Sequence, residues 1–203
     1  MRLYQMADSG NCYKTRLCAA QLGLKLEIVD VDILKGESRT EDFLKKNPNG
    51  RVPTLELDDG TFLAESNAQL FYLAEGSPLL PADRLIRAQT LQWMFFEQYS
   101  HEPYIAVARF WKSIAPNGEE EKKHMFPEWH ARGYQALDVM ERHLATHDFF
   151  AGNAYSIADI ALYAYTHVAH EGGFSLDAYP RVHAWLDRVA CQPGHIPMTD
   201  KPG

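Results

Sequence analysis

The residues with the clearest chemical potential lie in the loop at positions 6–14, between a short apolar run and a stretch rich in helix-forming residues. Ser9 and Asn11 would stand at the N-terminus of this helix, where backbone N–H groups lack partners and the helix dipole favours negative charge. A thiolate gains most from such donors, because the pKa of a thiol, about 8.5 when free, falls by several units beside them. The loop is therefore predicted to stabilise a thiolate, and a plain helix cap at Ser9 is the alternative.

The loop does not carry the two cysteines of a redox couple. It contains the run Ser9-Gly10-Asn11-Cys12, so a serine occupies the position at which a Cys-x-x-Cys motif has its attacking thiol. The stabilised thiolate is therefore expected to belong to a ligand. A mixed disulfide through Cys12, which lies further into the helix, is left open.

Two further segments offer groups that suit an extended peptide. If the Val52-Pro53 bond is cis, the backbone N–H and C=O of Val52 face outward and can pair with such a ligand. Glu65 and Ser66 stand where a predicted strand gives way to a helix, so that Glu65 can bind an ammonium group and Ser66 a carboxylate. A plain capping box over residues 66–69 is the alternative for the second segment.

The elements that position these residues predict a small α/β domain over residues 1–76. Strand and helix patterns follow one another in the order βαβ, then α, then ββα, with a Val-Pro step before the third strand and an Asp-Gly turn in the hairpin. This order is thioredoxin-like. The elements are expected at residues 3–6, 12–23, 26–31, 38–44, 52–57, 61–64 and 69–75.

The rest of the chain predicts an all-α domain over residues 84–203, after a linker with two prolines at residues 76–81. No segment of this region is a convincing strand. Helical periodicity runs through residues 84–112, where Pro103 should kink the helix. Further helices are expected at residues 119–147, after the capping box Ser156-Ile157-Ala158-Asp159, and from Pro180 to Val189, followed by a polar, mobile tail from Pro193 onward.

Composition narrows the classes of function. The 203 residues carry a net charge of −7, which excludes nucleic acid as an expected main partner, because phosphate binding needs clustered Lys and Arg. No apolar run reaches the roughly 18 residues of a membrane span, and no signal peptide is expected. Three cysteines favour a reducing, cytoplasmic location, and none of the nine histidines has partners at metal-ligand spacing.

The chain resembles the cytosolic glutathione transferases over essentially its full length. Four motifs carry the resemblance: Ser9-Gly10-Asn11, the run from Asn47 to Leu55 that includes Val52-Pro53, Leu63-Ala64-Glu65-Ser66-Asn67-Ala68, and Ser156-Ile157-Ala158-Asp159-Ile160-Ala161. The resemblance implies a thioredoxin-like glutathione-binding domain followed by an all-helical domain that borders the site of a small electrophile. It also implies a homodimer.

The resemblance assigns roles to the candidate residues. Val52 before cis-Pro53 would bind the cysteinyl backbone of glutathione, and Glu65 with Ser66 its γ-glutamyl end. Lys35 matches a position that often meets the glycyl carboxylate in bacterial members. An ordinary solvated lysine is the alternative interpretation of this residue. Ser9 and Asn11 would hold the thiol. Tyr104 and Arg109, on the helix that borders the electrophile pocket in this family, are the candidates for that pocket.

The subclass and the reaction stay open at this level. Ser9 resembles theta- and delta-like enzymes, whereas the combination of Ser9, Asn11 and Lys14 resembles nu-like bacterial enzymes, in which disulfide or peroxide reduction accompanies weak transferase activity. The leading hypothesis is attack of the glutathione thiolate on an electrophile. A glutathione-dependent disulfide reductase or peroxidase is the alternative, and a non-catalytic binding module on the same fold is the third possibility.

Overall fold

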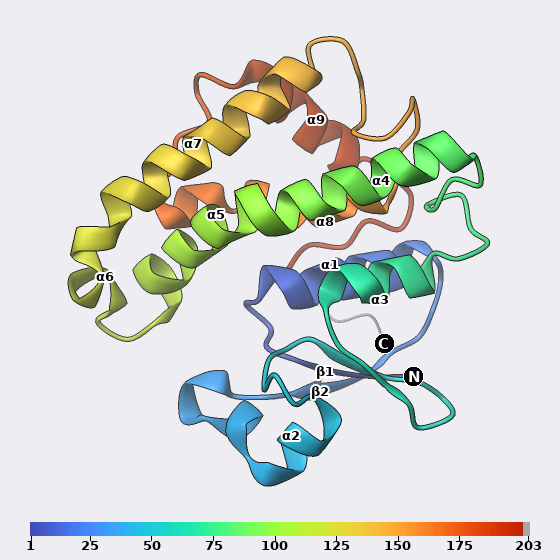
Figure 1. Cartoon of the computed structure of the whole chain (residues 1–203), viewed down its shortest axis with the longest axis vertical. Helices are drawn as coiled ribbons and strands as arrows, with labels where there is room; N and C mark the ends of the chain where they lie inside the picture. Colours follow the sequence, from blue (N-terminus) through green and yellow to red (C-terminus); the bar gives the residue numbers. More distant parts are fainter. Residues whose placement is uncertain (201–203) are drawn as a thin grey trace. The chain divides into compact units, whose positions relative to one another are not determined.

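The chain folds into two compact units, seen here in a computed structural model that describes residues 1–200 (Figure 1). The first unit comprises Met1–Ser77 and the tail segment 193–200, and the second comprises Pro78–Gln192. The boundaries expected from the sequence, 1–76 and 84–203, differ mainly in the tail. Residues 193–200 pack with the first unit because buried side chains of its first helix bind their backbone carbonyls.

The first unit contains a four-stranded sheet of order β2-β1-β3-β4. Its strands are β1 (Arg2–Gln5), β2 (Glu27–Asp30), β3 (Thr54–Glu56) and β4 (Phe62–Leu63). β2 runs parallel to β1, whereas β3 and β4 are joined as the antiparallel hairpin that the Asp-Gly turn predicts. Leu3 of β1 pairs with Ile28 and Leu55, so the centre of the sheet is apolar.

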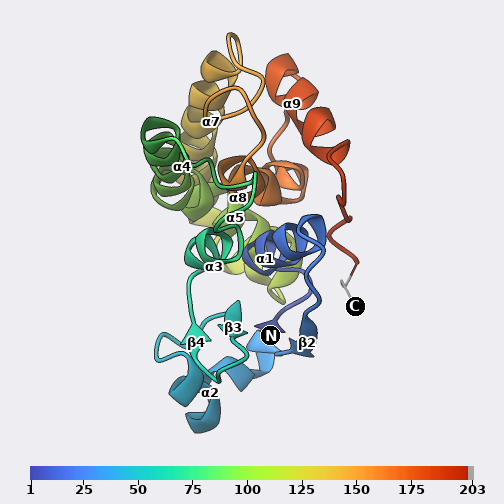
Figure 2. The same ribbon diagram turned by 90° about the vertical axis from the view of Figure 1, so that its right-hand side faces the viewer.

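Helices cover both faces of this sheet. α1 (Gly10–Gln21) and α3 (Ser66–Leu73) lie side by side on one face, and α2 (Glu41–Lys46) lies on the other (Figures 1 and 2). Short 3₁₀ turns at Ile33–Lys35 and Glu37–Arg39 connect β2 to α2. The arrangement confirms the predicted thioredoxin-like fold, and it brings the N-termini of two helices to the loops that carry the candidate residues.

The second unit contains helices and no strand in the part that the structure describes. Its helices are α4 (Arg84–Phe96), α5 (Glu102–Arg109), α6 (Gly118–Glu121), α7 (Phe126–His143), α8 (Ile157–Thr166) and α9 (Pro180–Ala190), with 3₁₀ turns at Lys123–Met125 and Ala169–Gly172. All ten residues of α8 are buried. α8 therefore forms the core of this unit, and α4, α5 and α9 pack against it.

The interruption predicted at Pro103 takes the form of a wider helical turn. Glu97–His101 is π-helical, and α5 restarts with Pro103 in its first turn. Proline lacks an N–H and its ring clashes with the carbonyl four residues earlier, so an α-helix cannot continue unchanged through this position. A second π-helical turn, Phe110–Ile114, ends this stretch of helix.

A capping box starts α8, as the sequence predicts. The Ser156 hydroxyl oxygen accepts a hydrogen bond from the Ala158 N–H at 3.3 Å, and the Asp159 carboxylate accepts one from the Ser156 N–H at 3.0 Å. Asp159 also accepts bonds from the Phe150 N–H at 3.1 Å and the Trp185 indole at 3.0 Å. The cap thereby fixes the start of the buried helix to α9 and to the preceding loop.

We expect Ser156→Ala to lower the free energy of unfolding by about 1 kcal/mol, because a buried helix cap is lost. Urea unfolding followed by circular dichroism measures this change. An unchanged unfolding midpoint would show that the cap does not contribute to stability.

Within residues 1–200, no helix combines the length and the apolar character that a membrane crossing requires.

Candidate active site

Ser9 lies at the N-terminus of α1 and is half-buried. Its hydroxyl oxygen accepts a hydrogen bond from the Cys12 N–H at 3.3 Å, and its own N–H donates to the Met6 carbonyl at 3.1 Å. The helix-cap interpretation and the ligand interpretation are therefore compatible. A hydroxyl that accepts a cap bond keeps its proton for donation to an anion next to the helix end.

Asn11 is fixed by two donors that reach one atom. Its Oδ1 accepts a hydrogen bond from the Lys14 ammonium at 2.8 Å and another from the Ser66 hydroxyl at 3.2 Å. Because an ammonium group only donates, the contacted atom must be the amide oxygen. The Nδ2 group is then the donor end of this side chain, and it belongs to the same loop as Ser9.

Lys14 is fully buried, and sequence analysis gave it no role beyond the family pattern. Burying an ammonium group is costly unless polar partners compensate it. Its hydrogen bond to Asn11 shows that it orients the loop side chain. The pattern Asn-x-x-Lys at a helix start was the available signal, because residues three apart share a helix face.

Glu65 and Ser66 stand at the start of α3. Glu65 is exposed and adopts φ 64° and ψ 112°, a conformation that is uncommon for a residue with a side chain and that often marks functional sites. Ser66 is 4% exposed, and its hydroxyl donates a hydrogen bond to Asn11 Oδ1. The contact joins the predicted γ-glutamyl segment to the predicted thiol segment, 55 residues apart in the sequence.

The capping box considered for residues 66–69 is not formed. α3 begins after Glu65 without a side-chain cap, and Gln69 is fully buried and bonded elsewhere. Gln69 Nε2 donates to the Pro53 carbonyl at 3.2 Å and to the Leu63 carbonyl at 2.8 Å, while Gln69 Oε1 accepts from the Thr15 hydroxyl at 2.7 Å. One side chain thus connects α1, α3 and the segment before β3.

The peptide bond between Val52 and Pro53 is cis, as the resemblance implies. The loop before it is held by Asn47, whose Nδ2 donates to the Arg51 carbonyl at 2.8 Å and to the Thr54 hydroxyl at 3.1 Å. Gly50 has φ 61°, and a Cβ there would lie 2.9 Å from the Ser38 carbonyl oxygen. The loop that leads to Val52 is therefore closely packed and tolerates only glycine at this point.

Lys35 lies at the end of a 3₁₀ turn, and its side chain is 79% exposed. Its ammonium forms an ion pair with Asp32 at 2.9 Å, and a hydrogen bond to Asp32 raises the pKa of Lys35. The nearby Glu37 carboxylate adds to this effect. The structure does not bring Lys35 into contact with the other predicted ligand-binding residues, so its role stays a prediction.

Cys12 is unsuited to act as a nucleophile. It is completely buried, and the loss of hydration raises the pKa of its thiol to about 11. Its Sγ accepts a hydrogen bond from the Met6 N–H at 3.4 Å, so the residue helps to shape the Ser9 loop. Burial likewise raises the pKa of Cys18 to about 12, whereas Cys191 is exposed.

Only Cys191 is expected to react rapidly with an aromatic disulfide reagent in the native protein, since the thiolate is the reactive form and the other two thiols stay protonated. Absorbance of the released thiol should give one fast equivalent per chain, and all three after denaturation. Cys191→Ser is the matched control and should abolish the fast phase. Rapid labelling of Cys12, identified by mass spectrometry, would contradict this account.

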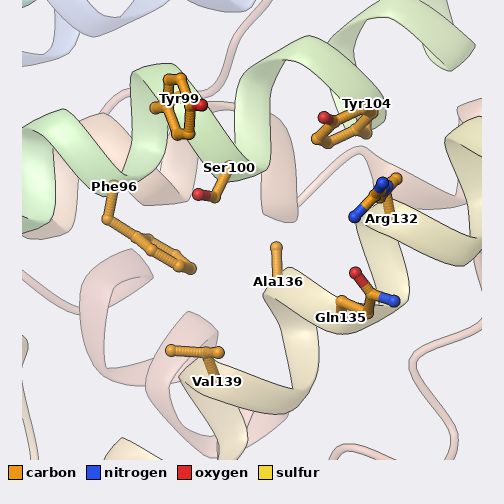
Figure 3. Close-up of a pocket in the computed structure, with 8 residues that line it drawn as sticks. All are labelled: Phe96, Tyr99, Ser100, Tyr104, Arg132, Gln135, Ala136 and Val139. Atoms are coloured by element: carbon orange, nitrogen blue, oxygen red, sulfur yellow. The ribbon is translucent and has the colours of Figure 1, made fainter.

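Tyr104 and Arg109 occupy different environments in the second unit. Tyr104 lines a cavity of about 350 Å³ between the α4–α5 segment and α7, together with Tyr99 and Arg132 (Figure 3). Arg109 is not among the residues that line this cavity. It is 5% exposed, and its Nε donates to the Glu171 carboxylate at 2.7 Å. The structure therefore does not unite the two candidates in one pocket of this unit, and their role toward an electrophile stays a prediction.

Several histidines pack against other rings or form hydrogen bonds. His143 stacks on His147 with ring centroids 4.2 Å apart, and His167 stacks on Tyr163 at 4.6 Å. Within residues 1–200, no group of three or more His, Cys, Asp or Glu side chains is arranged to hold a metal ion.

The fold and the geometry define the class of protein. A thioredoxin-like unit places Ser9 and Asn11 at the start of α1, where an anionic sulfur is favoured. It places Glu65 and Ser66 at the start of α3, where the helix end favours a carboxylate and the Glu65 side chain can bind an ammonium group. Such a unit suits a small peptide that carries a thiol and charged ends.

Comparison with known proteins agrees with this class. Residues 1–75 match the family "Glutathione S-transferase, N-terminal domain", and residues 106–188 match "Glutathione S-transferase, C-terminal domain". The crystal structure of a possible glutathione S-transferase from Rhodopseudomonas palustris is 53% identical, with a TM-score of 0.97 over 99% of this chain and 90% of that one. A glutathione S-transferase from Pseudomonas fluorescens Pf-5 is 56% identical, with a TM-score of 0.95 over 98% of both chains. Glutathione S-transferase 2 of Anopheles gambiae is 31% identical over 94% of this chain and 91% of its own length.

The chain therefore belongs to the glutathione S-transferase family. It is a glutathione transferase, an enzyme that binds glutathione. The resemblance drawn from the sequence motifs is confirmed at the level of the family and the fold. Assignment to a serine-type, theta-like or nu-like subclass remains a prediction.

Proposed function

We propose that glutathione lies along the first unit with its sulfur at Ser9 and Asn11. The observation that carries this proposal is the double contact to Asn11 Oδ1, because it turns the amide into a donor at the N-terminus of α1. The Ser9 hydroxyl and the helix dipole add to the same effect. The bound thiol then ionises near neutral pH.

The rest of the tripeptide is placed by the remaining segments. We propose that the Val52 backbone pairs with the cysteinyl residue, and that Lys35 meets the glycyl carboxylate. Glu65 is exposed and suits the γ-glutamyl ammonium group. Since the Ser66 hydroxyl donates to Asn11, the backbone N–H of Ser66 in the first turn of α3 is the group best placed for the γ-glutamyl carboxylate.

The proposed reaction is attack of the glutathione thiolate on an electrophilic carbon. A carbon–sulfur bond forms, the leaving group departs with its electron pair, and no covalent intermediate with the protein is needed. Binding in a fixed orientation adds proximity to the lowered thiol pKa. Conjugation of small toxic electrophiles in the cytoplasm is the role we propose.

Parallel assays test this function. The purified enzyme is supplied with glutathione and either a chloronitrobenzene or a mixed disulfide, and Ser9→Ala is the matched variant. We expect conjugation of the chloronitrobenzene, with a lower rate for Ser9→Ala. Turnover of the disulfide alone would overturn the transferase proposal in favour of a reductase, and turnover of neither substrate class would favour a binding module.

We also propose a homodimer. Leu85, Phe95 and Tyr99 on one stretch of helix are 67%, 70% and 84% exposed, and large exposed apolar side chains of this kind typically cover an interface. A second copy of the chain is the proposed partner, as most homo-oligomers are two-fold dimers.

Sedimentation at micromolar concentration is expected to show a species of twice the 23.1 kDa chain mass. Phe95→Asp combined with Tyr99→Asp should shift it to the mass of one chain, whereas Leu34→Asp, at an exposed leucine of the first unit, should not. A single species near one chain mass for the wild type would refute the homodimer.

A further inference from the structure

The tail that follows α9 packs against α1 and belongs to the first unit. The Tyr13 hydroxyl, which is completely buried, donates to the Ile196 carbonyl at 2.7 Å and lies 3.3 Å from His195 Nε2. Gly194 packs against the end of α1, where a Cβ would lie only 2.9 Å from the Gln21 Cα. The prediction of a mobile tail is therefore wrong for residues 194–198, which pack against α1.

Arg16 connects this tail to the loop that carries Ser9. The guanidinium is 1% exposed, and its Nη2 donates both to the Met198 carbonyl at 2.6 Å and to the Ala7 carbonyl at 3.0 Å. Its Nη1 donates to Gln5 Oε1. A buried guanidinium needs acceptors around it, and two of those present are backbone carbonyls from opposite ends of the chain.

The loop contacted by Arg16 is short, and Met6 anchors it on either side of Ala7 and Asp8. Met6 accepts a bond from the Ser9 N–H at 3.1 Å and donates to Cys12 Sγ at 3.4 Å. Ala7 lies between these anchors, and both Ala7 and Asp8 are exposed. The Arg16 bond to the Ala7 carbonyl is thus the link between the tail and the backbone just before Ser9.

We propose that residues 194–198 act as a strap that positions the Ser9 loop through Arg16. Arg16 is a positioning residue, since its contacts are with the loop backbone and the tail. Without the strap, the guanidinium loses one acceptor and draws in water or moves, and the Ala7 carbonyl loses a fixed partner. The effect on thiol activation rests on the proposed function of Ser9, whereas the effect on the loop does not.

Hydrogen exchange of the ligand-free protein tests the strap independently of activity. A chain ending at Gln192 and the full-length Arg16→Lys variant are each compared with the wild type. Lysine keeps the charge but lacks the planar fork that reaches two carbonyls. We expect the amides of Asp8 and Ser9 to exchange about tenfold faster in both variants, as for the loss of one hydrogen bond to a charged group. A chain ending at Asp200 keeps every named contact and is the matched control.

The pH dependence of kcat/KM is the second readout. In both variants the acid limb should move to higher pH while the Asp200-ending chain retains the wild-type profile. Faster exchange with an unmoved pH profile supports the strap and contradicts thiol activation by the Ser9 loop. Unchanged exchange in Arg16→Lys overturns the strap, even if the chain ending at Gln192 fails to fold.

Discussion

Replacing Glu65 and Ser66 together with alanine is expected to weaken glutathione binding by at least about tenfold. The Glu65 carboxylate is proposed to meet the γ-glutamyl ammonium group, and a hydrogen bond to a charged group contributes about 1.5–3 kcal/mol. Ser66→Ala keeps the backbone N–H that is proposed to meet the γ-glutamyl carboxylate, so the loss of Glu65 carries the effect, and each 1.4 kcal/mol is about tenfold in affinity. Glu65 is exposed at the helix start, so its loss leaves no buried group unpaired in the free protein.

Calorimetry with S-methylglutathione measures this change without interference from the thiol. A ligand without a free thiol is needed because Ser66 also donates to Asn11, so Ser66→Ala perturbs the proposed thiol-binding segment as well. Glu41→Ala, at an exposed glutamate that begins α2 on the other face of the sheet, is the matched control and should bind normally. An unchanged dissociation constant for the double variant would show that the γ-glutamyl end lies elsewhere.

Ser9→Ala is expected to raise the pKa of enzyme-bound glutathione by about 1–2 units, because one hydrogen bond to the thiolate is lost. Below the raised pKa a smaller fraction of bound glutathione is ionised, so turnover near neutral pH should fall by about 10- to 100-fold. At high pH the two enzymes should approach the same rate. Affinity for S-methylglutathione should change little, since that ligand has no thiol to ionise.

Ultraviolet titration of the thiolate in the binary complex measures this pKa, and three further variants sharpen the result. Asn11→Ala should raise the pKa in the same direction. If Asn11→Ala raises the pKa of bound glutathione more than Ser9→Ala does, the nu-like assignment is favoured over the serine-type assignment. Cys12→Ala should leave pKa and turnover unchanged, because the thiol is buried. Loss of activity in Cys12→Ala alone would mean a mixed disulfide with the protein and would contradict this mechanism.

Lys14→Met completes the set, since it keeps much of the apolar stem but removes the donor to Asn11 Oδ1. Because Lys14 orients Asn11, we expect the pKa of bound glutathione to rise in Lys14→Met as it does in Asn11→Ala. A wild-type titration would show that Lys14 only fills space.

Much of the fold of each unit could be predicted because the signals for it are local. The apolar strands, the Asp-Gly hairpin turn and the Ser156–Asp159 capping box each depend on residues within a few positions. Ser9 could be predicted on the same basis, as a hydroxyl between a strand and a helix. Its two interpretations, helix cap and thiol donor, do not compete, since one oxygen can accept and donate.

The contacts that organise the site could not be predicted, because they join distant positions. Ser66 meets Asn11 across 55 residues, and Gln69 meets Thr15 across 54. A capping-box spacing at residues 66–69 gave Gln69 a local role, but a buried amide is more stable when it satisfies several backbone groups. The Arg16 contact with Met198 spans 182 residues, and nothing in a polar tail sequence indicates such a partner.

The central claim is that the sulfur of glutathione is held by Ser9 and Asn11 at the start of α1. The crystal structure of the protein with bound glutathione tests it most directly. We predict the sulfur within hydrogen-bond distance of the Ser9 hydroxyl and the Asn11 amide, with the γ-glutamyl end at Glu65 and Ser66. A sulfur bonded covalently to Cys12, or a tripeptide whose thiol lies away from this loop, would contradict the claim.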